Sequence, residues 1–238
     1  MTAYRWTLLA FFALTWVWAA IDPIYPHDWL LENYLVFLSV PIILIWGRYF
    51  RLSDISYTLI TLFMMMHVAG SHYTYAETPF GYVLQDWFGS SRNMYDRFVH
   101  FCFGLLIAYP FRELLLRIAQ TTGFWGYFLP LNLVISAGAI FELIEWKVVE
   151  KVDVAAGVAY LGAQGDIWDA QKDIAVAAVG AFIALSIVAV FNWRYDPNFW
   201  KEFRASLRVP PSDHPLGEIS YRRMLKRYTA RKKAGKRG

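Results

Sequence analysis

Cysteine, charge and repetition are all scarce in this sequence. Cys102 is the single cysteine among 238 residues, so the chain cannot close an internal disulfide. Lys, Arg, Asp and Glu together make up only 18%, against about 25% in an ordinary soluble domain. Glycine (15) and proline (10) occur in ordinary numbers and apolar residues are abundant, which excludes collagen-like and disordered chains. The sequence contains no internal repeat, phosphate-binding glycine loop or nucleophile elbow.

What the chain has instead is a large hydrophobic content. Hydrophobic residues make up 57% and the mean hydropathy is +0.32. A bilayer core needs ~20 largely apolar residues in a helix. Six runs approach that length, at residues 6–21, 29–46, 53–70, 97–111, 124–146 and 169–193. The first lacks the small-residue cleavage pattern of a secretion signal. The sequence therefore predicts an all-α, polytopic membrane helix bundle with six transmembrane helices.

The distribution of lysine and arginine predicts the orientation, because cytoplasmic loops are enriched in them. From residue 194 to 238 there are thirteen basic and four acidic residues. With the tail inside and six spans, both termini are cytoplasmic, and eighteen basic residues lie inside. Five remain outside: Arg92, Arg97, Lys147, Lys151 and Lys172.

This division predicts a transmembrane domain at residues 1–195 and a basic cytoplasmic tail at 196–238. The run Pro210, Pro211, Ser212 and Asp213 precedes an end that we expect to be partly disordered. We expect the tail to set topology or contact anionic lipid head groups, and we expect no nucleic acid. A protein partner is not indicated.

Histidine and acidic residues gather at the predicted outer ends of the third to sixth spans. The third closes with His67 and His72, which would diverge on a continuous helix, so Gly70 is expected to end that helix and let His72 fold back. In the fourth, Asn93, Arg97, His100 and Gly104 share one helical stripe, bordered by Asp96, while Asn93 or Asp96 could instead cap the helix.

The fifth and sixth spans contribute most of the acids. Glu142 and Glu145 project from one side of a helix above Gly138, where another backbone could approach closely. Asp166, Asp169 and Asp173 begin a second stripe, which continues through small residues including Gly180 and Ala184 and predicts a helix contact. Asp166 or Asp169 could cap the last span, whereas Asp173 lies a turn inside it.

The acids of this region outnumber its fixed cations by six to three. Charges inside a membrane must be neutralised, hydrated or protonated, and a divalent metal would do so. Nitrogen and carboxylate ligands suit zinc, manganese or iron. The predicted metal ligands are His67, His72, His100, Glu142, Glu145 and Asp166, and the predicted catalytic residues are Arg97, Asp169 and Asp173.

Four stretches carry a resemblance to the YjdF-like family of bacterial inner-membrane proteins, a family of unknown function. They are residues 67–75 (HVAGSHYTY), 92–100 (RNMYDRFVH), 141–146 (FELIEW) and 161–173 (LGAQGDIWDAQKD). With the intervening spans they cover residues 5 to 195. The resemblance implies a multi-pass inner-membrane protein. It also implies that the four stretches belong to one site. A fainter resemblance to VanZ-like proteins rests on acids that open the last helix before small residues.

Three functions remain open from the sequence. The first is an outward-facing, metal-dependent hydrolase or transferase acting on a lipid or lipid-linked substrate, in which the metal activates water and Arg97 holds an anionic group. In it, Asp166, Asp169 or Asp173 is a ligand or general base. The second is a cation- or proton-coupled transporter, which a polar path through the bundle would favour. The third is a non-catalytic membrane assembly or resistance factor.

Overall fold

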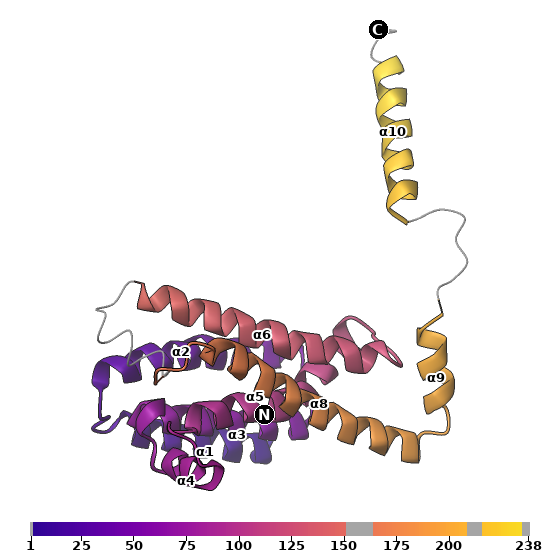
Figure 1. Cartoon of the computed structure of the whole chain (residues 1–238). Helices are drawn as coiled ribbons and strands as arrows, with labels where there is room; N and C mark the ends of the chain where they lie inside the picture. The colour runs from indigo at the N-terminus through magenta and orange to yellow at the C-terminus, as the bar shows by residue number, and fades with distance from the viewer. Residues whose placement is uncertain (1, 151–163, 209–215, 235–238) are drawn as a thin grey trace. The chain divides into compact units, whose positions relative to one another are not determined.

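The computed structural model describes residues 2–150, 164–208 and 216–234, and in these ranges the chain is helical, with no strands (Figure 1). The long helices of the first compact unit are α1 Ala3–Ala20, α2 Pro26–Tyr49, α3 Asp54–Tyr73, α5 Tyr95–Ile118, α6 Trp125–Val149 and α8 Asp169–Tyr195. Shorter helices are η1 Tyr75–Glu77, α4 Pro79–Phe88 and α9 Phe199–Ser206.

Each predicted span corresponds to one of the six long helices. Four of them, α2, α5, α6 and α8, are long and apolar enough to cross a membrane. Helices α1 and α3 have 18 and 20 residues, but Arg5 in α1 and Asp54, His67 and His72 in α3 lower their mean hydropathy. The all-helical fold class is thus confirmed, with four candidate membrane spans. Six spans and two cytoplasmic termini stay predictions.

Helix α3 differs from its prediction in a way that affects the site. Its first turn is capped by Ser53, whose Oγ accepts the N–H of Ser56 at 3.2 Å. The helix does not end at Gly70 but continues to Tyr73. Because a continuous helix rotates by about 100° per residue, His67 and His72 project in different directions, and His72 does not fold back.

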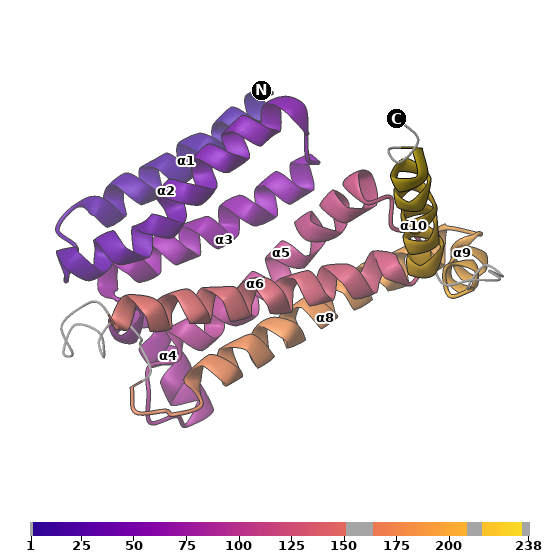
Figure 2. The ribbon, with the colours of Figure 1, turned by 90° about the horizontal axis from the view of Figure 1, so that it is seen from above.

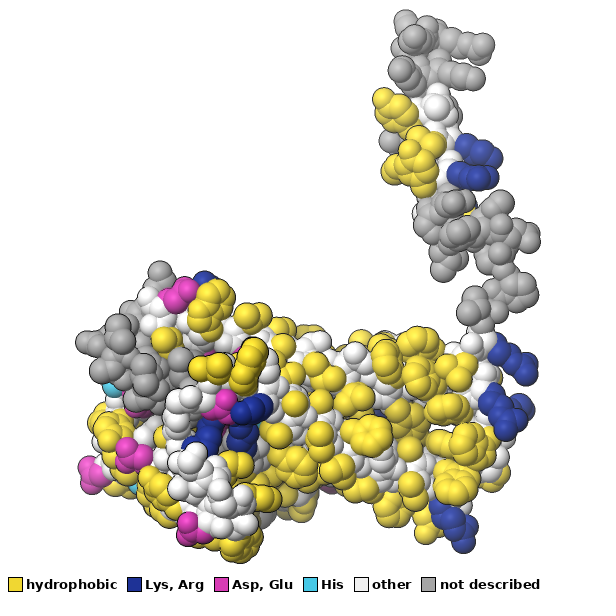
Figure 3. Space-filling model, in the orientation of Figure 1, with side chains coloured by type: hydrophobic (Ala, Val, Ile, Leu, Met, Phe, Trp, Pro, Cys, Tyr) yellow, Lys and Arg dark blue, Asp and Glu magenta, His cyan; other side chains and the backbone are white. Residues whose placement is uncertain are grey.

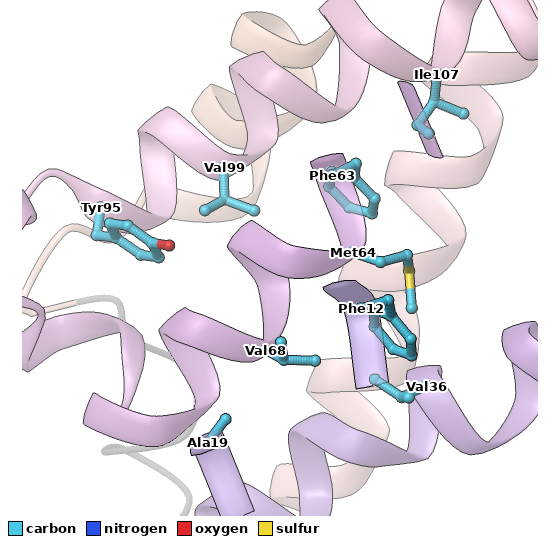
Figure 4. Packing of buried hydrophobic residues seen from close by; sticks show 9 residues of the cluster. All are labelled: Phe12, Ala19, Val36, Phe63, Met64, Val68, Tyr95, Val99 and Ile107. Atoms are coloured by element: carbon cyan, nitrogen blue, oxygen red, sulfur yellow. The ribbon is translucent and has the colours of Figure 1, made fainter. Parts of the chain in front are cut away.

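Helix α5 lies at the centre of the unit, packed against α3, α6 and α8 (Figure 2). Its contact with α8 is closest at two glycines. A Cβ at Gly104 would overlap the carbonyl oxygen of Ala177, and one at Gly180 would overlap the carbonyl oxygen of Phe101. The small-residue contact predicted at Gly180 is therefore confirmed. On the other side of α5, Phe12, Met64, Val68 and other apolar side chains join α1, α2 and α3 in one core (Figure 4).

Gly138 behaves differently from Gly104 and Gly180. A Cβ placed on Gly138 would meet nothing within 4 Å. The predicted close approach of another backbone at Gly138 is therefore wrong, since the residue lines an internal cavity instead.

These two environments predict opposite effects of the same substitution. We expect Gly104→Ala to cost about 1–3 kcal/mol, because the added methyl overpacks the α5–α8 contact. Gly138→Ala should be neutral or stabilising by up to about 1 kcal/mol, since alanine is the better helix former. Unfolding of both purified variants in detergent measures the difference, and equal losses would contradict the packing described here.

Polar contacts connect the helices at one end of the first unit. We call this end, which contains Arg5, Arg51 and Arg117, the basic end. Arg5 Nε donates to Asp54 at 2.7 Å, and Arg117 donates to the carbonyl of Arg51. Buried Glu113 accepts from the backbone and hydroxyl of Ser53 at 2.8 Å each. At the opposite, acidic end lie the first turns of α2, α5 and α8 and the last turns of α1, α3 and α6. Figure 3 shows hydrophobic side chains covering the surface between these two ends.

The described part of the chain after α8 holds two helices. Helix α9 belongs to the first compact unit, which ends at Ser206, and the division into a transmembrane domain at 1–195 and a cytoplasmic tail stays a prediction. It is held there because Ser206 Oγ accepts the N–H of Phe124 at 2.9 Å, and its backbone accepts from Trp125. The second unit contains α10, Leu216–Ala234, whose described side chains are mostly exposed. The run of prolines at 210–211 lies outside the described residues, and partial disorder of the tail stays a prediction.

Candidate metal centre

Arg92, in the loop before α5, and Arg97, in the first turn of α5, bind aspartates at the start of α8 and in the loop before it. Arg97 donates to Asp169 Oδ1 at 2.5 Å and to Asp166 Oδ2 at 3.1 Å, and its Nη1 lies 3.1 Å from Asp173 Oδ1. Arg92 also pairs with Asp169. Arg92, Arg97, Asp169 and Asp173 are buried. The two sequence stripes predicted on α5 and α8 therefore face each other, and the ion pairs fix the register of these helices.

The side chain of Gln164, before α8, binds the backbone of Asn93, before α5, and so joins the two loops. Gln164 accepts the N–H of Asn93 at 2.9 Å and donates to the Asn93 carbonyl at 3.2 Å. The side chain of Asn93 in turn accepts the N–H of Tyr95, the first residue of α5, at 3.0 Å, although the N-cap position itself is held by Met94 and not by Asn93 or Asp96. Asp166 accepts the N–H of Trp168 before α8. Residues 161–163 of the LGAQGDIWDAQKD stretch lie outside the described residues.

A possible metal site lies directly behind this network. Asp96, His100 and Asp173 each offer one ligand atom, and these atoms lie within 4.8 Å of one another. Two ligands of one zinc ion, each at about 2.2 Å, lie at most about 4.4 Å apart. Small side-chain rotations would bring the three atoms to one ion. The cluster could therefore hold a metal.

Glu142 reaches the same place from α6. Its Oε1 lies 3.4 Å from His100 Nε2, which also lies 3.6 Å from Asp96 Oδ1. The side chain of Glu142 is 10% exposed and that of Asp173 is 2% exposed. Glu142 Oε1 takes part in no hydrogen bond, whereas Asp173 Oδ1 is paired with Arg97 Nη1 at 3.1 Å. Buried acceptors without a donor are uncommon, and they mark positions where a cation or proton would be stabilising.

The cluster opens into a cavity of about 570 Å³ bounded by α2, α3, α5 and α6. Its polar end is formed by Glu32, His67, Tyr75, Asp96, His100 and Glu145. The remainder of the wall is largely apolar and extends as far as Trp46 and Phe50 at the end of α2.

His67 lines this cavity but its ring nitrogens are occupied. His67 Nε2 lies 3.1 Å from the carbonyl oxygen of Glu32, which can only accept, so Nε2 carries the proton. Nδ1 then accepts from the Tyr75 hydroxyl at 2.5 Å. Burial raises the pKa of the Tyr75 phenol well above its ordinary value, so the phenol keeps its proton. In this arrangement His67 has no lone pair free for a metal.

His72 lies apart from the cluster. Its Nδ1 is 3.2 Å from the carbonyl oxygen of Ala19, and its ring stacks on Trp18 with centroids 4.7 Å apart. Asp166 also faces elsewhere, toward Lys172 Nζ at 2.6 Å. This hydrogen bond holds the pKa of the Asp166 carboxyl below its usual range. Of the predicted ligands, the structure therefore brings His100 and Glu142 together and places Glu145 at the adjoining cavity, whereas His67, His72 and Asp166 have other partners.

Sequence reasoning missed two participants. Asp96 was treated as a cap or border residue, yet it supplies a ligand atom of the cluster. Glu32 of α2 was not considered, although it is buried and lines the cavity. A carboxylate inside a predicted membrane span is itself a signal of function, and that signal could have found Glu32. Arg97, predicted to hold a substrate anion, pairs with the α8 aspartates, and its contact with a substrate stays a prediction.

Apolar helices around a buried polar cluster define an integral, multi-pass membrane protein. Residues 4–194 match the family described as "Predicted membrane protein (DUF2238)". The chain is also 37% identical over 172 residues to the "Inner membrane protein YjdF" of Escherichia coli (strain K12), covering 71% of this chain and 82% of that protein. The chain belongs to this family of inner-membrane proteins, as the four sequence stretches predicted. No solved structure matches it.

Proposed function

We propose that this protein is a membrane-embedded, metal-dependent hydrolase or transferase that acts on a lipid or lipid-linked substrate. One observation carries the proposal. Three ligand atoms within 4.8 Å of one another lie near Glu142 Oε1, a buried carboxylate oxygen without a hydrogen bond, at the head of an apolar cavity. A lipid could present its polar head to the ligands while its chain lies in the cavity.

In this proposal His100, Asp96 and Asp173 hold the metal. One nitrogen and several carboxylate oxygens suit zinc, manganese or iron. A bound metal would lower the pKa of water toward neutrality and polarise a phosphoryl or carbonyl oxygen. Glu142, 3.4 Å from His100, is placed to accept a proton or to complete the ligand set.

The arginines have a positioning role in this scheme. Arg97 holds Asp169 and Asp173 at the start of α8, and Arg92 binds the same oxygen of Asp169. The ion pair with Arg97 orients the carboxylate of Asp173 before any ligand binds. The network thereby presents the cluster as a preorganised site on rigid helices.

The cavity wall supports an enzyme over a transporter. A transporter needs polar groups along the path of its cargo. Between the cluster and the basic end, the cavity wall is apolar except for side chains such as Ser39 and Tyr57. The third hypothesis, a non-catalytic assembly factor, predicts a protein that keeps its complexes without metal.

We also propose six spans with both termini in the cytoplasm, so that the cluster faces the outer leaflet. The proximity of Arg5, Arg51 and Arg117 at the basic end supports this orientation. Exposed basic side chains of α10, including Arg223, Lys226 and Arg227, support contact with anionic lipid head groups. Protease treatment of sealed vesicles tests the orientation, since the tail should be cut only from the cytoplasmic side.

Metal analysis of the purified protein tests the main proposal. We expect close to one divalent ion per chain, removable by a chelator and lost from the Glu142→Gln, Glu145→Gln double variant. The loss is expected because these carboxylates neutralise the ion beside His100. Metal-free wild-type protein that keeps its activity in cells would overturn the proposal and favour the assembly factor.

A further inference from the structure

We propose that the cavity binds one long hydrocarbon chain of a membrane lipid whose head group carries a positively charged amine. This inference rests on the proposed function in one respect: it names the substrate class of the same site. The binding itself is a separate claim, because a lipid can occupy the cavity whether or not a metal is present.

The dimensions of the cavity match a single lipid chain. On α2 its lining begins at Glu32 and ends at Phe50, a helical distance of about 27 Å. The hydrocarbon core of a bilayer is about 30 Å thick. The lining along this path includes Ile43 and Met64 on one side and Phe103, Ile107 and Phe141 on the other. A chain that follows the cavity would therefore lie roughly parallel to its neighbours in the bilayer.

The wall chemistry also distinguishes a chain from a protein segment. A protein helix is about 10 Å wide, so a helix bound in the cavity would need a wide gap between α2 and α6. A hydrocarbon chain is thin and needs no hydrogen-bond partner, so a narrow apolar wall suffices. Gly138 widens the cavity at one point, because its missing side chain leaves open space on α6.

The head group, not the chain, must select the lipid. A hydrocarbon chain that leaves the bilayer exchanges one apolar environment for another, so the cavity wall adds little preference. The polar end of the cavity is lined by Glu32, Asp96 and Glu145, and no lysine or arginine lines any described part of it. This arrangement attracts a cation and repels an anionic head group.

When these acids are ionised, a single divalent metal balances only part of their charge. Glu142, beside His100, and Asp173, beside Arg97, add two carboxyl groups to the three that line the cavity, while Arg97 is shared among three aspartates of the α8 region. Glu32 and Glu145 form no ion pair with a described Lys, Arg or His, because every such pair in this region involves other acids. An ammonium group placed between Glu32 and Glu145 would supply the missing positive charge.

The test compares an amine lipid with an anionic one on the intact protein. Purified protein is reconstituted in nanodiscs of equal parts phosphatidylethanolamine and phosphatidylglycerol, extracted again in mild detergent, and the retained lipid is measured by mass spectrometry. We expect about one phosphatidylethanolamine per chain and an enrichment over phosphatidylglycerol of at least ~tenfold, the preference that one charge-assisted contact provides. Equal retention or a preference for phosphatidylglycerol would overturn the inference.

Two matched pairs of variants locate the lipid. Gly138→Leu should abolish retention because the new side chain fills the cavity, whereas Ser136→Leu, on the exposed side of α6, should not. Ile43→Trp fills the same cavity from α2 and guards against a folding defect specific to Gly138. Glu32→Gln should reduce the preference for the amine lipid about tenfold, while Asp28→Asn, one turn earlier and outside the lining, should leave it unchanged.

Metal content is measured on the same samples so that the two proposals fail separately. Gly138→Leu and Glu32→Gln are expected to keep their metal, since neither residue belongs to the ligand cluster. Selective lipid retention by a protein without metal would contradict only the enzyme proposal. Metal without selective retention would overturn this inference alone. A disulfide between two chains of an Ile43→Cys variant would also overturn it, because it would show that a second copy of the chain closes the cavity.

Discussion

Replacement of His100 by alanine is expected to weaken divalent-metal binding by at least ~10- to 100-fold. Loss of an outer-shell partner alone has effects of that size, and His100 supplies the one nitrogen ligand of the cluster. Its Nε2 lies between Asp96 and Glu142, at 3.6 and 3.4 Å, so its removal leaves carboxylates facing one another. Titration of the metal-free protein with zinc or manganese measures the change.

His72→Ala provides the matched control for this measurement. Both histidines were predicted as ligands, but His72 contacts Ala19 and Trp18 rather than the cluster. We therefore expect His72→Ala to keep wild-type metal affinity. A result in which both variants lose metal equally, or in which only His72→Ala does, would show that the metal lies elsewhere.

The second large effect is expected at Asp169, and it concerns stability. Asp169→Asn should lower the free energy of unfolding by about 1.5–3 kcal/mol, because Arg92 and Arg97 lose the buried carboxylate that they share and keep only their contacts with other aspartates. The helix contact between α5 and α8 depends on this pairing, so the metal cluster should loosen as well. Unfolding in detergent, followed by circular dichroism, measures the loss.

Asp166→Asn separates this effect from a general loss of negative charge. Asp166 also pairs with Arg97, but it is more exposed, and its second partner is the exposed Lys172. Exposed ion pairs contribute about 0.2–1 kcal/mol. A loss for Asp166→Asn as large as that for Asp169→Asn would contradict the assignment of Asp169 as the buried centre of the network.

Much of the site could be predicted because helical periodicity places residues on faces. The steps of three and four from Asn93 to Gly104, and from Asp166 to Ala184, correctly predicted two stripes that meet at the α5–α8 contact. Periodicity says which residues share a face but not where a helix ends. The assumption that Gly70 ends α3 therefore misplaced His72.

Glu32 shows a different limit. It belongs to the second span, whereas the other predicted site residues lie in the third to sixth, so no pattern along the sequence connects it to His100. Only the packing of α2 beside α3 brings it to the cavity. For the same reason the occupied nitrogens of His67 could not be foreseen, because its partners are the Glu32 carbonyl and the Tyr75 hydroxyl.

The sequence alone determined that this protein lies in a membrane and that its backbone is helical. An apolar excess needs a bilayer, and a backbone in a bilayer must satisfy its hydrogen bonds within helices, so composition alone leads to a helical membrane protein. Only the tertiary structure decided which titratable groups meet. Lipid offers little hydrophobic force to order helices, so specific contacts such as Gly104 on Ala177 and Arg97 on Asp169 select one arrangement. That arrangement placed His100, Asp96 and Asp173 around one point.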